Sequence, residues 1–342
     1  MKTCTSLSSN NYLAGTIVLN TIAEVTKMIA TGKPLLLAGS EAALAQLPKG
    51  NWIGGTTSYF IGSDGGTFSE SSIYVDKIPD FVPGFKIADY STQTLPAVFS
   101  DAPAKGFSVL ILPAGSDVHI AYAEDASRYE GFVLKPVVGW VSGVPLPEIG
   151  RTAPKVFNGV TGESFASRAV AMHVTLPADK IADIEIVNVF KPGSGDKITF
   201  PKPGFTQEQC SINGKPTNFA KYLASVDADI RLPLTASYNG SVVNVSIQSV
   251  DEASHVVRLY APVFTGVEYT VAAPVTDYVA AFEAALPAKK SDAVFACNCI
   301  LNYMYANLAG KTAGSVPSMI TFGEIAHQLL NQTLVRLVIH TC

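Results

Sequence analysis

Charged residues are scarce in this sequence. Only 15% of the 342 residues are Asp, Glu, Lys or Arg, against about 25% in an average globular protein. The 24 basic and 28 acidic residues give a net charge of −4 and form no basic block, so nucleic acid is not expected as a partner. No run of about 18 apolar residues occurs, which leaves no candidate membrane span and predicts no membrane partner.

Cysteine is also rare. The five cysteines are scattered and odd in number, which is typical of reduced thiols rather than of a disulfide framework. Residues 3 to 13, TCTSLSSNNYL, are too polar for the apolar region of a secretory signal. Together these observations predict a cytoplasmic protein.

Several motifs of known chemistry are missing. The sequence has no GxSxG elbow, no HExxH and no Walker lysine, and its glycines do not follow the GxGxxG order that opens a nucleotide-binding helix. The five histidines show no ligand spacing, and Cys297 and Cys299 have no second cysteine pair nearby, as a zinc site requires. We therefore expect neither a cofactor nor a metal.

Apolar side chains are abundant, at 48% of the sequence. The chain is longer than the roughly 250–300 residues that one hydrophobic core serves, which predicts two domains. Residues 191–205, KPGSGDKITFPKPGF, are rich in proline and glycine and predict the connection. The expected domains are residues 1–200 and 201–342.

Alternating and continuous apolar segments interleave with helical patterns along the chain. They predict an α+β fold: two mixed α/β halves, with mostly antiparallel sheets packed face to face and helices outside. Expected helices cover 16–31, 41–47 after a Ser40 cap, 213–226 with Pro216 in the first turn, 276–286 and 301–308. Expected strands include 35–39, 52–60, 72–78, 107–115, 137–143, 169–176, 241–250, 255–263, 267–275, 292–299, 319–325 and 333–340.

Residues 52–60, WIGGTTSYF, place hydroxyls beside glycines. Thr56, Thr57 and Ser58 supply donors and acceptors next to the accessible backbone of Gly54 and Gly55, which suits a small polar ligand such as a carboxylate. The alternative is a strand and hairpin in which the glycines only allow tight turns.

Cys297 and Cys299 lie one residue apart in an apolar segment, so on a strand both thiols face the same side. One interpretation is a pair of small buried core residues. The other is a reactive thiol, with His327 as its base.

The C-terminal segment 318–339 places polar residues between two apolar strands. Gly323 and Glu324 follow the first strand, and Asn331, Gln332 and Thr333 precede the second. Such residues either bond the backbone across a turn or face a pocket, and Gly323 allows close backbone approach.

These C-terminal residues resemble the end of the FIST family (F-box and intracellular signal-transduction proteins). Thr321–Ile325 resembles its TyGEI element, and Asn331–Thr333 resembles its HNqT element. Cys297 falls on the cysteine of the family's Ser-Cys strand, and residues 52–60 resemble its Gly-x-(Ser/Thr)-Thr strand. Ile300 and Leu330 replace an arginine and a histidine that are usual there.

The resemblance implies a divergent ligand-sensing module for small molecules such as amino acids, with a possible protein partner. We therefore expect a stand-alone cytoplasmic sensory or binding protein that performs no chemistry. A protein–protein interaction module and an enzyme that uses Cys297 or Cys299 are the alternatives.

The expected pocket joins the early and late segments. Glu324 binds an ammonium group in this hypothesis, while hydroxyls and amides bind a carboxylate. The predicted ligand-binding residues are Gly54, Gly55, Thr56, Thr57, Cys297, Thr321, Gly323, Glu324, Asn331 and Thr333.

Overall fold

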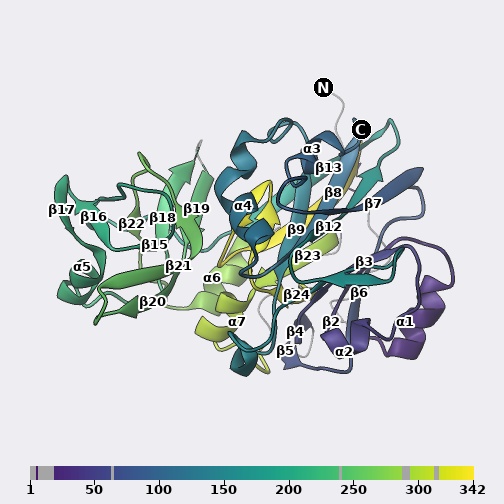
Figure 1. The fold of residues 1–342 in the computed structure, drawn as a ribbon, viewed down its shortest axis with the longest axis horizontal. Helices are drawn as coiled ribbons and strands as arrows, with labels where there is room; N and C mark the ends of the chain where they lie inside the picture. Colours follow the sequence, from purple (N-terminus) through teal and green to yellow (C-terminus); the bar gives the residue numbers. More distant parts are fainter. Residues whose placement is uncertain (1–4, 7–18, 63–64, 239–240, 287–292, 312–315) are drawn as a thin grey trace.

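The computed structural model describes residues 5–6, 19–62, 65–238, 241–286, 293–311 and 316–342. It has a body of three larger sheets and a lobe of small sheets beside it, on the left in Figure 1. The predicted α+β class with mostly antiparallel pairing is confirmed: among the described strands, only β2–β3, β8–β9 and β23–β24 pair in parallel.

Each of the three body sheets combines strands from distant parts of the chain. The first sheet contains β11 (Glu163–Phe165), β10 (Val156–Asn158), β3 (Trp52–Thr56), β2 (Leu35–Gly39) and β6 (Ile73–Lys77). The second contains β26 (Gln328–Leu330), β25 (Glu324–Ala326), β9 (Val137–Ser142), β8 (Gly106–Pro113), β12 (Ala169–Thr175) and β7 (Gly84–Tyr90). The third contains β1 (Thr5–Ser6), β27 (Leu334–Thr341), β23 (Ala293–Cys299), β24 (Ser318–Thr321), β4 (Tyr59–Gly62) and β5 (Gly65–Phe68), with β13 (Lys180–Val187) also paired to β27.

The inner faces of the three sheets share one core. Ile53 from the first sheet, Trp140 from the second and Phe295 from the third belong to the same buried cluster. The rings of Trp140 and Phe295 stack with their centroids 5.8 Å apart. Because each of these strands is covered on both faces, its sequence is a continuous apolar run rather than an alternation.

Helices cover the outer faces. The first sheet carries α1 (Ile22–Ile29) and α2 (Glu41–Leu44), and the second carries α3 (Ala97–Ser100) and α4 (Asp117–Asp125). The third carries α6 (Tyr278–Ala285) and α7 (Ile300–Tyr305). Within the described part of the chain, no helix is long and apolar enough to span a membrane.

The chain crosses between sheets at three corners. Thr57 and Ser58 lie between β3 and β4, and Phe322 and Gly323 lie between β24 and β25. Residues 331–333 join β26 to β27. The segments 52–60 and 319–325, each expected as one strand, are therefore two strands apiece, because the ladder partner changes where the chain leaves one sheet for the next.

The lobe is built from residues 198–271. It contains β14 (Ile198–Thr199), β15 (Gly204–Gln207), β16 (Gln209–Ile212), β17 (Lys215–Asn218), α5 (Phe219–Ser225), β18 (Leu234–Tyr238), β19 (Ser241–Val245), β20 (Ile247–Asp251), β21 (Val256–Val263) and β22 (Thr270–Val271). Its apolar residues belong to the same buried cluster as α4 and the outer face of the second sheet.

The helix expected over 213–226 is partly wrong. Asn213 and Gly214 have φ values of 49° and 82° and turn the chain from β16 into β17. Asn-Gly with positive φ at both residues is the signature of a two-residue hairpin turn. Pro216 lies in the edge strand β17, and the helix begins only after Asn218, whose side chain accepts from the amide of Lys221.

Two other expectations need correction. The helix expected over 16–31 begins at Ile22 after a Thr21–Glu24 capping box, and Val18 of its predicted apolar face lies outside the described residues. Cys342 is disulfide-bonded, so the prediction that every cysteine is reduced is wrong. The cysteine pattern therefore no longer supports a cytoplasmic location.

Strands from the two ends of the chain pair with each other. β27 pairs along its length with β13, and β24 pairs with β4, so the hydrogen-bonded sheets connect residues on both sides of position 200. The division into domains 1–200 and 201–342 stays a prediction.

A buried polar junction at the third corner adds to the apolar contact between body and lobe. The Asn331 side-chain oxygen accepts from the Ser246 amide at 3.0 Å and from the Ser246 hydroxyl at 2.7 Å. The side-chain Nδ2 of Asn244 donates to the Asn331 backbone carbonyl at 3.1 Å. Gln332 donates through its side chain to the Arg231 carbonyl at 3.0 Å.

Asn331→Ala tests this junction. The variant leaves the buried Ser246 amide without its acceptor, and we expect the free energy of unfolding to fall by about 1–3 kcal/mol. Urea denaturation measures the change, and hydrogen exchange locates it at Ser246. Gln328→Ala, at a half-buried position on β26, is the control. Equal stability of the two variants would contradict the assignment.

Candidate functional site

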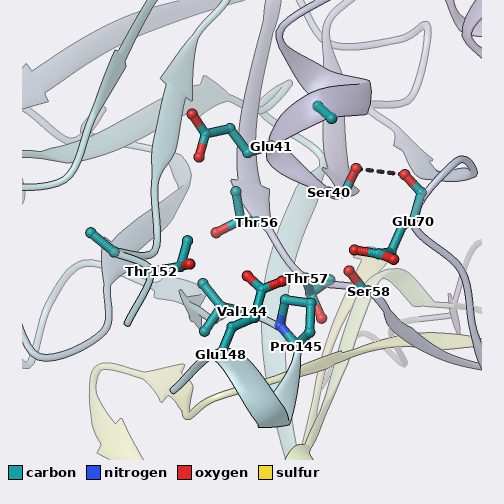
Figure 2. Close-up of a pocket in the computed structure, with 13 residues that line it drawn as sticks. Ser40, Glu41, Thr56, Thr57, Ser58, Glu70, Val144, Pro145, Glu148 and Thr152 are labelled. Carbon is teal, nitrogen blue, oxygen red and sulfur yellow. Dashed lines mark hydrogen bonds between the residues drawn. The ribbon is translucent and has the colours of Figure 1, made fainter. Parts of the chain in front are cut away.

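An open pocket of about 200 Å³ lies at the first corner, where the chain passes from β3 to β4. Figure 2 shows its hydroxyl and carboxylate side chains arranged around the recess. We call it the hydroxyl pocket. It is lined by Ser40, Glu41, Ala42, Thr56, Thr57, Ser58, Glu70, Gly143, Val144, Pro145, Glu148, Thr152 and Ala153.

The floor of the pocket is the strand corner itself. The Thr56 hydroxyl accepts from the Lys155 amide at 3.0 Å, which leaves its own proton to donate. The Thr57 hydroxyl donates to the Ile320 carbonyl at 2.6 Å. Ser58 is 1% exposed, and its hydroxyl forms no hydrogen bond within the described part of the chain.

Three carboxylates stand around this floor. Glu41 comes from the first turn of α2, and its carboxylate forms an ion pair with Lys155 at 2.5 Å. Glu70 lies on the turn before β6, where its carbonyl accepts from the Ser40 hydroxyl at 2.6 Å. Glu148 ends the short 3₁₀-helix Leu146–Glu148.

The polar side chains of the pocket lining are hydroxyls and carboxylates. Neither cysteine nor histidine is among its lining residues, so no thiol or imidazole is available there as nucleophile or base. Within the described ranges, no group of three or more His, Cys, Asp and Glu side chains is placed to hold a metal ion.

Gly54 and Gly55 lie beneath the pocket and act through packing. A Cβ atom on Gly55 would lie 2.7 Å from both Ile111 and the indole nitrogen of Trp140. A Cβ atom on Gly54 would lie 3.2 Å from the Leu37 carbonyl oxygen. Gly55 therefore allows the first sheet to approach the second closely, whereas Gly54 allows close packing within the first sheet.

The predicted C-terminal residues gather around Glu324, which is fully buried. One carboxyl oxygen accepts from the Thr333 hydroxyl at 2.9 Å and from the Thr333 amide at 3.3 Å. The other accepts from the Thr321 hydroxyl at 3.4 Å. Thr321 also donates to the Gly323 carbonyl, so the carboxyl joins the second and third corners of the fold.

Burial controls the ionisation of this cluster. Desolvation raises the pKa of Glu324 from 4.5 to about 8, although the hydrogen bonds from Thr333 act in the opposite direction. Desolvation, with the Glu324 charge adding to it, also raises the pKa values of Cys297 and Cys299 well above the ordinary thiol value. Cys297 belongs to the buried cluster of Trp140 and Phe295, whereas Cys299 belongs to a different one, so the shared facing of the two thiols stays a prediction.

The environment of the cysteines is that of a core. Cys297 is fully buried and its thiol donates to the Gly139 carbonyl at 3.3 Å. Cys299 is 1% exposed. A buried, protonated thiol is a poor nucleophile, so this geometry does not support the proposed cysteine chemistry.

The structure brings the early and late segments together without joining their polar groups in one recess. Thr57 bonds to Ile320, and the Gly143 amide donates to the Thr56 carbonyl at 2.7 Å. Of the predicted set, however, only Thr56 and Thr57 line the hydroxyl pocket. Ligand binding by the remaining predicted residues stays a prediction.

Sequence reasoning missed the outer half of the pocket. Glu70, Glu148 and Thr152 come from separate turns, and Glu41 follows a cap that was interpreted only as a helix start. No local spacing relates these residues, because their proximity arises from the pairing of β10, β3, β2 and β6.

Gly55→Ala tests the close approach of the sheets. The added methyl group meets Trp140 and Ile111, and we expect the free energy of unfolding to fall by about 1–3 kcal/mol. Gly84→Ala on β7 is the matched control, because nothing lies within 4 Å of its added Cβ. Chemical denaturation measures the free energy of unfolding of both variants. A Gly55→Ala protein as stable as the wild type would show that the two sheets do not approach closely at Gly55.

Glu324→Gln tests the buried carboxyl. An unfolded Glu loses its proton near pH 4.5, whereas the folded one keeps it to about pH 8, so stability falls as pH rises between these values. This group contributes a slope of at most about 1.4 kcal/mol per pH unit.

Denaturation across this pH range should show a flatter profile for Glu324→Gln than for the wild type. Glu252→Gln, at an exposed position, is expected to keep the wild-type slope. Parallel profiles for all three proteins would mean that Glu324 ionises normally.

No curated protein matches this chain, but one family model does. The model of a family of unknown function, DUF6976, matches residues 20–340 and carries no FIST assignment. Because the match covers nearly all of the chain, the protein belongs to the family of unknown function DUF6976.

Proposed function

We propose that this protein binds a small polar ligand in the hydroxyl pocket and performs no chemistry on it. The observation that carries the proposal is the gathering of hydroxyl groups from Ser40, Thr56, Thr57, Ser58 and Thr152 around one open recess. A few convergent polar groups in a concave site are sufficient to orient a small ligand.

The floor of this recess is rigid. Thr56 is held by its amide, which donates to the Lys155 carbonyl at 3.0 Å, and by its hydroxyl, which accepts from the Lys155 amide. The Thr57 amide donates to the Gly39 carbonyl at 3.0 Å. Hydroxyls fixed in this way require little ordering when a ligand binds, which favours affinity.

A sensory function belongs to the same proposal. The resemblance to FIST proteins implies a sensor of small molecules, and two residues of the resembling strand, Thr56 and Thr57, line the pocket. Ligand binding at the corner between the first and third sheets gives such a sensor a direct connection to both sheets.

A protein partner is the second candidate. Val133 and Leu134 are neighbouring apolar residues with 84% and 82% of their surface exposed. Large exposed apolar side chains in one loop are a feature of interaction surfaces. Val133 and Leu134 do not line the hydroxyl pocket, so a partner bound at this loop is compatible with a ligand bound in the pocket.

A thermal-shift screen with amino acids, polyols, amines and organic acids tests ligand binding. A compound at ten times its Kd stabilises the fold by about 1.4 kcal/mol, and we expect at least one to raise Tm by about 2 °C. Thr56→Val removes the hydroxyl that is free to donate and should abolish the shift. Thr206→Val, on an exposed strand position of the lobe, should retain it. A flat screen would refute the proposal.

A further inference from the structure

We propose that the hydroxyl pocket selects an organic cation, namely a short aliphatic compound with a primary ammonium group. This inference rests on the proposed function and specifies its ligand class. It depends on the charge of the lining, on the Ser58 hydroxyl of the floor, which is unpartnered among the described residues, and on the backbone amides that already donate to carbonyls.

All charged side chains that line the pocket are carboxylates. Glu41 is neutralised by Lys155. Neither Glu70 nor Glu148 forms an ion pair within the described residues. Arg151 follows Glu148 by three residues but does not line the pocket. The recess therefore presents two uncompensated negative charges to a ligand, which favours a cation.

The floor adds a specific recognition element. Ser58 is almost completely buried, yet its hydroxyl lines the pocket and has no hydrogen-bond partner among the described residues. Figure 2 shows Ser58 and the Glu70 carboxylate on the same side of the recess, and both residues line it. An ammonium group has three donors and no acceptor, so it can bond one hydroxyl oxygen and nearby carboxylates together.

Three backbone amides of this floor are unavailable to a carboxylate on the ligand. The amides of Thr56, Thr57 and Gly143 all donate to backbone carbonyls of Lys155, Gly39 and Thr56. No Lys, Arg or His is among the lining residues. A free amino acid would place its negative charge among glutamates, which is unfavourable, so the pocket disfavours the zwitterion that the sequence suggested.

The remaining lining fits an aliphatic chain. Ala42, Val144, Pro145 and Ala153 supply the apolar surface of the pocket. At about 30 Å³ for each water in the liquid, a volume of about 200 Å³ suits a compound of a few carbon atoms. A metal ion is a poorer match, because the described carboxylates form no group able to hold one.

Four compounds with the same four-carbon chain test the inference by calorimetry at low ionic strength. Putrescine carries two ammonium groups, 4-aminobutyrate one ammonium and one carboxylate, 1,4-butanediol no charge, and succinate two carboxylates. We expect putrescine to bind with a Kd at least tenfold below that of the other three. Added salt should weaken its binding, because the attraction is between charges.

Variants locate the binding. Glu148→Gln and Glu70→Gln should each raise the Kd of putrescine about tenfold without lowering the Tm of the free protein. Ser58→Ala should weaken binding as well. Glu252→Gln, an exposed change in the lobe, should leave the Kd unchanged. Equal losses in Glu252→Gln and Glu148→Gln would indicate diffuse charge attraction and contradict the inference.

The outcomes separate the two proposals. If 4-aminobutyrate, 1,4-butanediol or succinate binds more tightly than putrescine, the selection of a cation is refuted, but the binding of a polar ligand in the pocket is not. If putrescine does not bind while another compound raises Tm in the thermal-shift screen, the selection of a cation is likewise refuted and the pocket function is retained. A screen in which no compound of any class binds would remove the pocket function together with the inference.

Discussion

The three body sheets share one core, and the chain must therefore leave one sheet and enter another at the corners between them. A corner ends the strand ladders, so its amides and carbonyls need partners from side chains. The Thr57 hydroxyl supplies one by donating to the Ile320 carbonyl, and the Glu324 carboxyl supplies another by accepting from the Thr333 amide. The polar residues at these corners thus follow from the sharing of a core.

The corners differ in their exposure to water, and this difference sets their chemistry. Glu324 is fully buried, so desolvation raises its pKa to about 8, and its oxygens accept hydrogen bonds from Thr333 and Thr321. Glu148 and Glu70 stand at an open pocket beside Ser58, whose hydroxyl has no partner among the described residues. The first arrangement stabilises the fold, and the second is available to a ligand.

The sequence predicted helices and strands well where a single local segment is sufficient to form the element. The Ser40 cap places the start of its helix correctly, and the apolar runs place β2, β8, β9 and β23. It failed where sheets meet, because the polar residues at Ser58 and Gly323 do not reveal that the chain changes its ladder partner there. The pocket could be predicted only in its Thr56–Thr57 floor, since its acidic rim depends on long-range strand pairing.

Crystals of the protein grown with putrescine provide the most direct test of ligand selection at the first corner. The structure predicts density for the diamine within the hydroxyl pocket, with an ammonium nitrogen in hydrogen-bond distance of the Ser58 hydroxyl and of the Glu148 or Glu70 carboxylate. A saturated crystal with the pocket filled only by water, or with the diamine bound elsewhere, would contradict it.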